Sequence, residues 1–265
     1  MSTSTDQTAT ITAEQIVDLL ERLYNQQDPS ALRALAAPDL RHYSSGIGDG
    51  VDAWAEYAAS FADHQPLIAV HRTVTEGGRV AIHAHYRWNA DREIDGGPGV
   101  AVGHVFTIDG DRIVEAIEVT QTVAPETVSG NDMFSQLRPS VDASHDLDRN
   151  RRTAERVVTE FLAGATSLRD ELLSDYLQHN PFIPDGADGI AGFIDTLGGN
   201  PNDFQWSIAE GDLAWTYTRY RSEAMPTGPL VAVDIWRFDE AGKVTEHWDV
   251  LEPDFTSPSS RTFPG

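Results

Sequence analysis

The order of secondary-structure signals in the first half of this sequence recurs in the second half. In the first half, helical patterns near residues 12–27, 28–37 and 54–61 precede strand patterns at 67–76, 79–88, 100–108 and 112–122. In the second half, helical patterns at 152–163, 168–176 and 190–197 precede strand patterns at 203–210, 213–223, 230–238 and 243–251. A repeat with a period of about 131 to 137 residues constrains the chain to form two copies of one fold.

Short matches align the two halves. Leu40-Arg41-His42 corresponds to Leu177-Gln178-His179, Gly78-Arg79 to Gly211-Asp212, and residues 113–119 to residues 244–250. Helices followed by an antiparallel meander indicate an α+β fold in each half, with the helices packed in the concave side of a curved sheet. We therefore predict domains at 11–122 and 151–252, joined by a linker at 123–150 that is rich in Pro, Ser, Asp and Asn. The two cone-shaped domains are expected to pair as a pseudo-dimer, and the whole chain could also form a homodimer.

The stretch from Ala232 to Val250 reads as a β-hairpin around the turn Asp239–Gly242. A symmetric hairpin pairs residues whose numbers sum to about 481, which places Asp234 directly across from His247. Cross-strand partners have Cβ atoms roughly 5 Å apart, within hydrogen-bonding reach for a carboxylate and an imidazole. Asp249 lies two residues beyond His247 and therefore on the same face. The hairpin predicts a cluster of three titratable groups.

Composition narrows the classes of function. The net charge of −23 argues against nucleic-acid binding, because phosphate groups require a basic surface. No apolar run approaches the roughly 20 residues of a membrane-spanning helix, and residues 1–10 lack the features of a secretory signal. The chain has no cysteine, which excludes disulfides, thiolate zinc sites and cysteine nucleophiles. A cytoplasmic location is expected, with residues 1–10 as a disordered lead-in.

The motifs resemble the SnoaL-like branch of the nuclear transport factor 2 (NTF2) superfamily. Those that carry the resemblance are Gln178-His179-Asn180-Pro181, Pro184-Asp185-Gly186, Val233-Asp234-Ile235 and Glu246-His247-Trp248-Asp249-Val250 in the second half, and His83-Ala84-His85-Tyr86 and residues 125–134 in the first. The second half is similar to the SnoaL-like aldol-condensation enzymes. The resemblance implies two NTF2-like cone-shaped domains and a small-molecule substrate. The same fold hosts many unrelated chemistries.

The two halves carry different residues at equivalent positions. Where the second half has Asp234, His247 and Asp249, the first half has His104, Ala116 and Glu118; where the first half has His83 and His85, the second half has Thr216 and Thr218. Neither half holds the full set. The two pockets are therefore expected to differ in function, or one of them to be vestigial.

The second half supplies the candidate catalytic residues. Asp234 and His247 form a general base with its orienting partner, and Asp249 lines the pocket or supports His247. His179, in the loop before the third helix, is expected to polarise a carbonyl group or to donate to an enolate oxygen. The alternative is a structural ion pair with His179 capping its loop. Trp236, Trp248 and Tyr217 are candidates to enclose a flat substrate, or else residues of the core.

The first half supplies candidate substrate-binding residues. His83 and His85 share one face of a strand, and a turn near Ile94-Asp95 would place His85 opposite His104, with His42 at the mouth of the pocket and Glu118 inside it. Three histidines on neighbouring strands also resemble a His₃ zinc site. Metal binding, metal-free acid–base chemistry and a polar pocket lining all remain open for this half.

The sequence therefore predicts a cofactor-free acid–base enzyme with no resident metal. The expected reaction is removal of a proton next to a carbonyl group, giving an enolate that cyclises, condenses or isomerises; the family resemblance implies an intramolecular aldol reaction on a small or polyketide-like substrate. The alternatives are a non-catalytic binding or assembly protein, and a metal-assisted lyase or hydratase that uses the first-half histidines.

Overall fold

The computed structural model describes residues 11–63, 66–87, 98–141, 146–221 and 228–254, and the chain divides after Thr122 into two compact units, residues 1–122 and 123–265. Each unit is α+β and contains one sheet of five strands. The lead-in at residues 1–10, the turn at Ile94-Asp95 and the ends of two expected strands, Trp88 and residues 222–223, lie outside the described residues.

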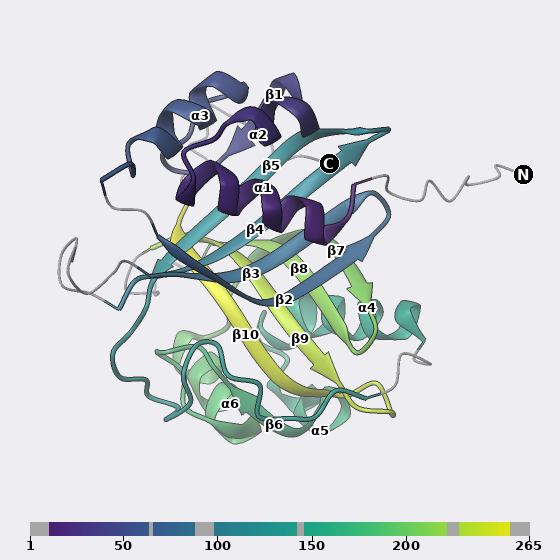
Figure 1. The fold of residues 1–265 in the computed structure, drawn as a ribbon. Coiled ribbons are helices and arrows are strands. Elements are labelled where there is room, and N and C mark those ends of the chain that lie inside the picture. Colours follow the sequence, from purple (N-terminus) through teal and green to yellow (C-terminus); the bar gives the residue numbers. More distant parts are fainter. Residues whose placement is uncertain (1–10, 64–65, 88–97, 142–145, 222–227, 255–265) are drawn as a thin grey trace, which may run out of the picture. The chain divides into compact units, whose positions relative to one another are not determined.

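The first unit packs its helices against one face of its sheet (Figure 1). Its elements are α1 (Ala13–Asn25), α2 (Ser30–Leu35), β1 (Ala36–Tyr43), α3 (Val51–Ala59), β2 (Leu67–Glu76), β3 (Arg79–Arg87), β4 (Val100–Asp109) and β5 (Arg112–Thr122). Helix α1 begins at a capping box in which Thr12 and Gln15 bond to each other's backbone N–H groups. Its apolar stripe, which includes Ile16, Leu20 and Leu23, is buried in the core.

The second unit repeats this plan. Its elements are α4 (Leu147–Arg156), a π-helical turn η2 (Val157–Phe161), a 3₁₀ turn η3 (Thr166–Leu168), α5 (Arg169–Leu172), β6 (Leu173–Gln178), α6 (Gly186–Leu197), β7 (Asn202–Glu210), β8 (Leu213–Tyr220), β9 (Leu230–Phe238) and β10 (Val244–Pro253). The strand orders are β1-β5-β4-β3-β2 and β6-β10-β9-β8-β7. The core lies between the helices and one face of the sheet.

Each sheet has one strand that the sequence analysis missed, and neither sheet is purely antiparallel. Strand β1 runs parallel to β5, and β6 runs parallel to β10. Residues 173–176, predicted as helix, are part of β6. Strands β1 and β6 each follow directly on a short helix, so the sequence pattern there still looks helical. They are strands because they pair in parallel with residues about 70 positions away in the sequence.

The expected linker is also part of the second unit. The chain divides at Thr122–Val123, and residues 131–141 bond to strands and turns of the second unit rather than forming a free tether. Among the described residues, no helix is both long and apolar enough to cross a membrane.

The two sheets have equivalent strand orders, but the predicted correspondence of His42 with His179 is wrong by one residue. His104 pairs with Glu118 in the first unit as Asp234 pairs with Asp249 in the second. His42 pairs with Ala116, whereas His247 pairs with Gln178. The backbone N–H of His42 donates to Asp49 Oδ1 at 2.9 Å, and that of Gln178 donates to Asp185 Oδ1 at 2.8 Å. His42 therefore corresponds to Gln178 and not to His179.

Helix α6 offers a test of how closely this unit is packed. A Cβ atom at Gly189 would lie 2.5 Å from the Pro184 carbonyl oxygen, whereas a Cβ at Gly192, in the same helix, would meet nothing within 4 Å. Gly189→Ala should therefore lower the free energy of unfolding by about 1–3 kcal/mol. Gly192→Ala should raise it by up to about 1 kcal/mol, because alanine loses less backbone entropy in a helix. Denaturant unfolding of both variants tests this; equal stability of the two would contradict the packing of α6 on the preceding turn.

Candidate functional site

A cavity of about 50 Å³ lies between α6 and the sheet of the second unit. Its walls are mostly apolar and include Ile190, Phe193 and Ile194 of α6. Six of the described lining residues have polar side chains: Asn180, Asn200, Tyr220, Asp234, His247 and Asp249. A space of this size holds a few water molecules, so it fits a small ligand or the reacting end of a larger one.

The register of β9 and β10 brings the three titratable groups together, although not by the predicted pairing. Asp234 pairs with Asp249, and His247 pairs with Trp236, because the register shifts at an irregularity between Val244 and Glu246. The predicted register was wrong by two residues, and a shift of two residues leaves every side chain on its expected face of the sheet. Consequently His247 Nε2 lies 3.4 Å from Asp234 Oδ1 and 4.0 Å from Asp249 Oδ2, and all three residues are buried.

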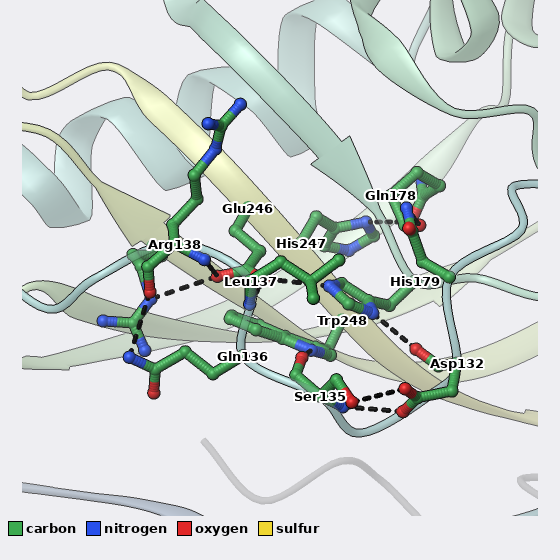
Figure 2. Close-up of polar contacts among 12 residues, drawn as sticks. Asp132, Ser135, Gln136, Leu137, Arg138, Gln178, His179, Glu246, His247 and Trp248 are labelled. Carbon is green, nitrogen blue, oxygen red and sulfur yellow. Dashed lines mark hydrogen bonds and ion pairs between the residues drawn. The ribbon is translucent and has the colours of Figure 1, made fainter.

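Gln178 determines which nitrogen of His247 carries a proton. The backbone N–H of Asn180 donates to Gln178 Oε1 at 2.8 Å, and Gln178 Nε2 donates to the Tyr176 hydroxyl at 2.9 Å. This fixes Oε1 as the acceptor that faces His247 Nδ1 at 3.1 Å, as Figure 2 shows. His247 must therefore donate through Nδ1, and its Nε2 is turned toward the two carboxylates. The imidazole also stacks on Trp236, with ring centroids 3.9 Å apart.

Asp234 is held by three neighbours. The Tyr220 hydroxyl donates to Asp234 Oδ2 at 3.0 Å, and the Thr216 hydroxyl approaches the same oxygen at 3.5 Å. Its other oxygen faces His247 Nε2. Burial and the nearby negative charge of Asp234 raise the pKa of Tyr220 well above its usual value, so Tyr220 is a neutral donor. With both oxygens occupied, Asp234 is suited to orienting His247.

Asp249 differs from Asp234 in having an oxygen without a partner. Asn180 Nδ2 donates to Asp249 Oδ2 at 2.7 Å, and Asn180 is fixed in this orientation because its Oδ1 accepts from the Phe182 N–H at 2.8 Å. Asp249 Oδ1 is buried and makes no hydrogen bond. Burial raises the pKa of Asp249 from 3.8 to about 6; the charge on His247 opposes this shift and that on Asp234 adds to it. A buried carboxylate with a free lone pair and a pKa near neutrality is suited to accepting a proton.

Three residues expected at this pocket lie on the opposite face of the sheet. His179 stacks on Trp248 with ring centroids 5.0 Å apart, and its Nε2 is 3.0 Å from Glu246 Oε1. Tyr217 pairs with Val233, one position out of phase with Asp234. The expectation that His179 enters the cavity is therefore wrong, and neither Trp248 nor Tyr217 lines it. The alternation of side chains along β8 and β10 is the physical reason for Tyr217 and Trp248, whereas His179 follows the last residue of β6.

Glu246 organises this opposite face by accepting several hydrogen bonds (Figure 2). The backbone N–H groups of Leu137 and Arg138 donate to its two oxygens at 2.6 and 3.2 Å. His179 bonds to Glu246 through Nε2 and to the carbonyl oxygen of Asp132 through Nδ1. Burial acts to raise the pKa of Glu246, but the hydrogen bond from His179 and the backbone N–H groups outweigh it and lower that pKa. This network attaches residues 132–138 to the sheet.

In the first unit the predicted histidine cluster does not form. His104 pairs with Ile82, and His85 pairs with Ala101, so His83 and His85 lie on the face opposite His104. Arg72 Nη1 donates to His83 Nδ1 at 2.5 Å, and His85 Nε2 is 2.8 Å from the Pro98 carbonyl oxygen. The three histidines therefore cannot share one metal ion. Among the described residues, the one group with metal-ligand geometry is Asp234, His247 and Asp249.

The first unit nevertheless contains its own cavity, of about 200 Å³. Glu118 lines it as expected, and His104 lies behind with Nδ1 3.5 Å from Glu118 Oε2. His42 is fully buried and packs edge-on against Trp54, with ring centroids 4.9 Å apart, so it does not form the mouth of the pocket.

The sequence analysis missed Gln178, Asn180 and Tyr220 as site residues. The motif Gln178-His179-Asn180 was recognised, but its central histidine was assigned to the pocket, whereas its two neighbours face the site. Strand alternation from Gln178 would have assigned these faces. Tyr220 follows Thr216 by four residues on the same strand, so strand alternation would also have predicted that it lies on the same face as Thr216, the partner of Asp234.

The pKa of Asp249 is raised and that of Glu246 is lowered, so removing the charge of each residue should have opposite effects on the stability of the protein. The raised pKa of Asp249 means that its stabilising contribution is complete below about pH 4 and is lost as the pH rises through 6. Asp249→Asn should therefore stabilise the protein at pH 8 and have little effect at pH 4. The gain at pH 8 should be up to about 3 kcal/mol, because the pKa of Asp249 rises from 3.8 to about 6 on folding. The lowered pKa of Glu246 gives stability above its usual pKa that is lost in acid, so Glu246→Gln should destabilise at pH 8 by about 1–3 kcal/mol. Unfolding curves at both pH values test this, and a destabilised Asp249→Asn at pH 8 would contradict it.

Comparisons with known proteins bear on residues 16–116, which match the model of the SnoaL-like domain family. No curated protein matches the chain. Among solved structures, TsrD from Streptomyces laurentii is similar, with 17% identity over 42% of this chain and 91% of that protein, and a TM-score of 0.35.

Two further solved structures show a similar degree of likeness. IdmH from Streptomyces antibioticus, for which a polyketide cyclase function has been suggested, has 20% identity over 41% of this chain and 91% of its own, with a TM-score of 0.35. An NTF2-like protein of unknown function from Cytophaga hutchinsonii has 15% identity over 43% and 94% of the two chains, with a TM-score of 0.33.

Proposed function

Given a chain that carries a SnoaL-like domain at residues 16–116, we propose that the protein is an acid–base enzyme that forms enolates from small carbonyl compounds in the cavity of its second unit. The observation that carries this proposal is the unpartnered, buried oxygen of Asp249 beside His247. Buried polar atoms in proteins usually have a hydrogen-bond partner, so an oxygen without one is available to a ligand.

The proposed reaction begins with a proton transfer from the carbon next to the carbonyl group to Asp249 Oδ1. The electron pair of the broken C–H bond moves onto the carbonyl oxygen and gives an enolate. His247, protonated at Nδ1 toward Gln178 and at Nε2 toward Asp234, would supply the positive charge that stabilises this oxygen. Asp234 holds the imidazole in place.

The size of the cavity limits the substrate. A space of about 50 Å³ does not enclose a polycyclic molecule, so the reactive carbonyl must belong to a small compound or to the end of a longer one. The apolar walls formed by α6 strengthen the electrostatic interactions inside the cavity by keeping water out. Whether the enolate then cyclises, condenses or isomerises depends on the substrate, and the aldol-type reaction is the one that we favour.

Hydrogen–deuterium exchange tests the proton-transfer step without a known substrate. Small ketones and β-dicarbonyl compounds in D₂O should exchange their α-protons faster with the protein than without it, as followed by NMR. The rate should rise through about pH 6, because Asp249 must lose its proton to act as a base. Asp249→Asn should slow the exchange by about 10²-fold or more, and Asp234→Asn should also slow it.

Glu240→Gln is the matched control, because it removes one negative charge at an exposed turn position. It should leave the exchange rate unchanged. A folded wild-type protein that exchanges none of these compounds above the solvent rate would contradict the enzyme proposal and favour a non-catalytic binding protein. Retention of the full rate by a folded Asp249→Asn variant would instead remove Asp249 as the base.

A metal-dependent form of the same chemistry is the second candidate. Asp234, His247 and Asp249 each offer a ligand atom, and these atoms lie within 4.8 Å of one another. Gln178 orients His247 through Nδ1 and leaves Nε2 for a ligand, which is the arrangement usual for metal-binding histidines. Exchange that stops after chelation and returns with Zn²⁺ or Mn²⁺ would favour this candidate; exchange that is indifferent to chelation would favour the metal-free reaction.

A further inference from the structure

The cavity of the first unit has walls of a different chemical kind from those of the second. Four aromatic rings line it, contributed by α1, α3, the segment after α3, and β3: Tyr24, Tyr57, Phe61 and Tyr86. Its volume of about 200 Å³ is larger than that of the second-unit cavity but below the usual range for drug-sized ligands.

The rings meet edge to face and so surround the space from different sides. Ring centroids of Tyr24 and Phe61 are 6.0 Å apart at 68°, those of Tyr24 and Tyr86 are 5.7 Å apart at 72°, and those of Tyr57 and Phe61 are 5.3 Å apart at 72°. Burial raises the pKa values of Tyr24 and Tyr86 well above the usual value, so both are neutral phenols whose rings keep their electron-rich faces.

Among the described residues that line the cavity, Glu118 is the one carboxylic acid, and none of them is a lysine, arginine or histidine. Glu118 is only 5% exposed. His104 lies behind it, but burial lowers the pKa of His104 to about 3, so this neighbour is neutral at physiological pH. His104 Nε2 is instead bonded to the Tyr86 hydroxyl at 2.9 Å. The described walls of the cavity therefore combine a buried carboxyl group with aromatic rings.

We propose that this cavity binds a small organic cation, with a methylated ammonium group held against the tyrosine and phenylalanine rings and facing Glu118. Aromatic faces attract cations through their quadrupoles, and the attraction grows when the cation is desolvated. A buried carboxylate adds a direct charge interaction in a low-dielectric setting. An anionic ligand is disfavoured by both features.

The degree of methylation follows from the scarcity of hydrogen-bond acceptors. A primary ammonium group brings three N–H donors into the cavity, and each one left without an acceptor costs free energy. The side-chain oxygens of the described lining residues belong to Glu118, Thr120 and the tyrosines. The hydroxyl of Tyr24 already accepts from Trp54 Nε1 at 3.1 Å, and that of Tyr86 is bonded to His104 Nε2 at 2.9 Å. Tertiary and quaternary ammonium ions have one N–H donor or none, so they need fewer acceptors, and their methyl groups present more apolar surface to the rings.

A pair of probes of nearly equal shape isolates the role of charge. Choline carries a trimethylammonium group, and 3,3-dimethylbutan-1-ol replaces its nitrogen with carbon and is neutral. Isothermal titration calorimetry of the full chain at pH 7.5 should show choline binding at least about tenfold more tightly than the neutral compound. Equal affinity for the two probes, or absence of choline binding, would overturn the proposal.

Two variants locate the binding in this cavity. Glu118→Gln keeps the shape of the side chain and should weaken choline binding by about tenfold or more without changing binding of the neutral probe. Tyr57→Leu, at a half-buried wall position, should weaken choline binding by roughly three- to tenfold. Unchanged choline affinity in either variant, with a wild-type melting curve, would contradict the site.

The Glu240→Gln variant controls for the loss of a negative charge elsewhere and should bind choline as the wild type does. If Glu118→Gln does not fold, Tyr57→Leu and the probe pair still decide the question. Calorimetry measures binding rather than catalysis, and the first-unit variants locate that binding, so the outcome does not depend on whether the second unit catalyses proton exchange.

Discussion

The alternation of side chains along β10 is the constraint on which the second unit depends. His247 and Asp249 face the cavity, while Glu246 and Trp248 face the other side of the same sheet. The irregularity between Val244 and Glu246 sets the register of this strand against β9. If the register moved by one residue, the two sets would exchange faces and both would lose their partners. One strand thus places the candidate site and the anchoring network simultaneously.

The two faces of that strand have opposite energetic character. Glu246 accepts hydrogen bonds from two backbone N–H groups and a histidine, which favours its charged form in the folded protein. Asp249 is buried with one oxygen unsatisfied and with Asp234 directly across from it. Such a group weakens the folded state at neutral pH and is retained only when other interactions compensate. The network around Glu246 lies next to it in sequence and provides such compensation.

Much of the architecture could be predicted from sequence, because long strands with regular alternation carry a strong local signal. Strands β5 and β9 lie where the pattern placed them, and Thr12 begins α1 as expected. The missed strands, β1 and β6, are defined by parallel pairing with distant residues, which local periodicity does not contain. The Asp234–His247 contact was predicted because an error of two positions preserves the face of a strand. His179 was misplaced because it lies beyond the end of β6, where a shift of one residue reverses the direction of a side chain.

The matching contacts of His42 with Asp49 and of Gln178 with Asp185 have a consequence for how such a chain can diverge. Both are made by the backbone N–H of the first residue, so they do not depend on whether its side chain is an imidazole or an amide. The turn before the third helix is therefore maintained by one aspartate in each copy, while the side chains that face the two cavities are free to change. Substitutions in either pocket can therefore leave this turn intact, so that two units with one scaffold can have different specificities.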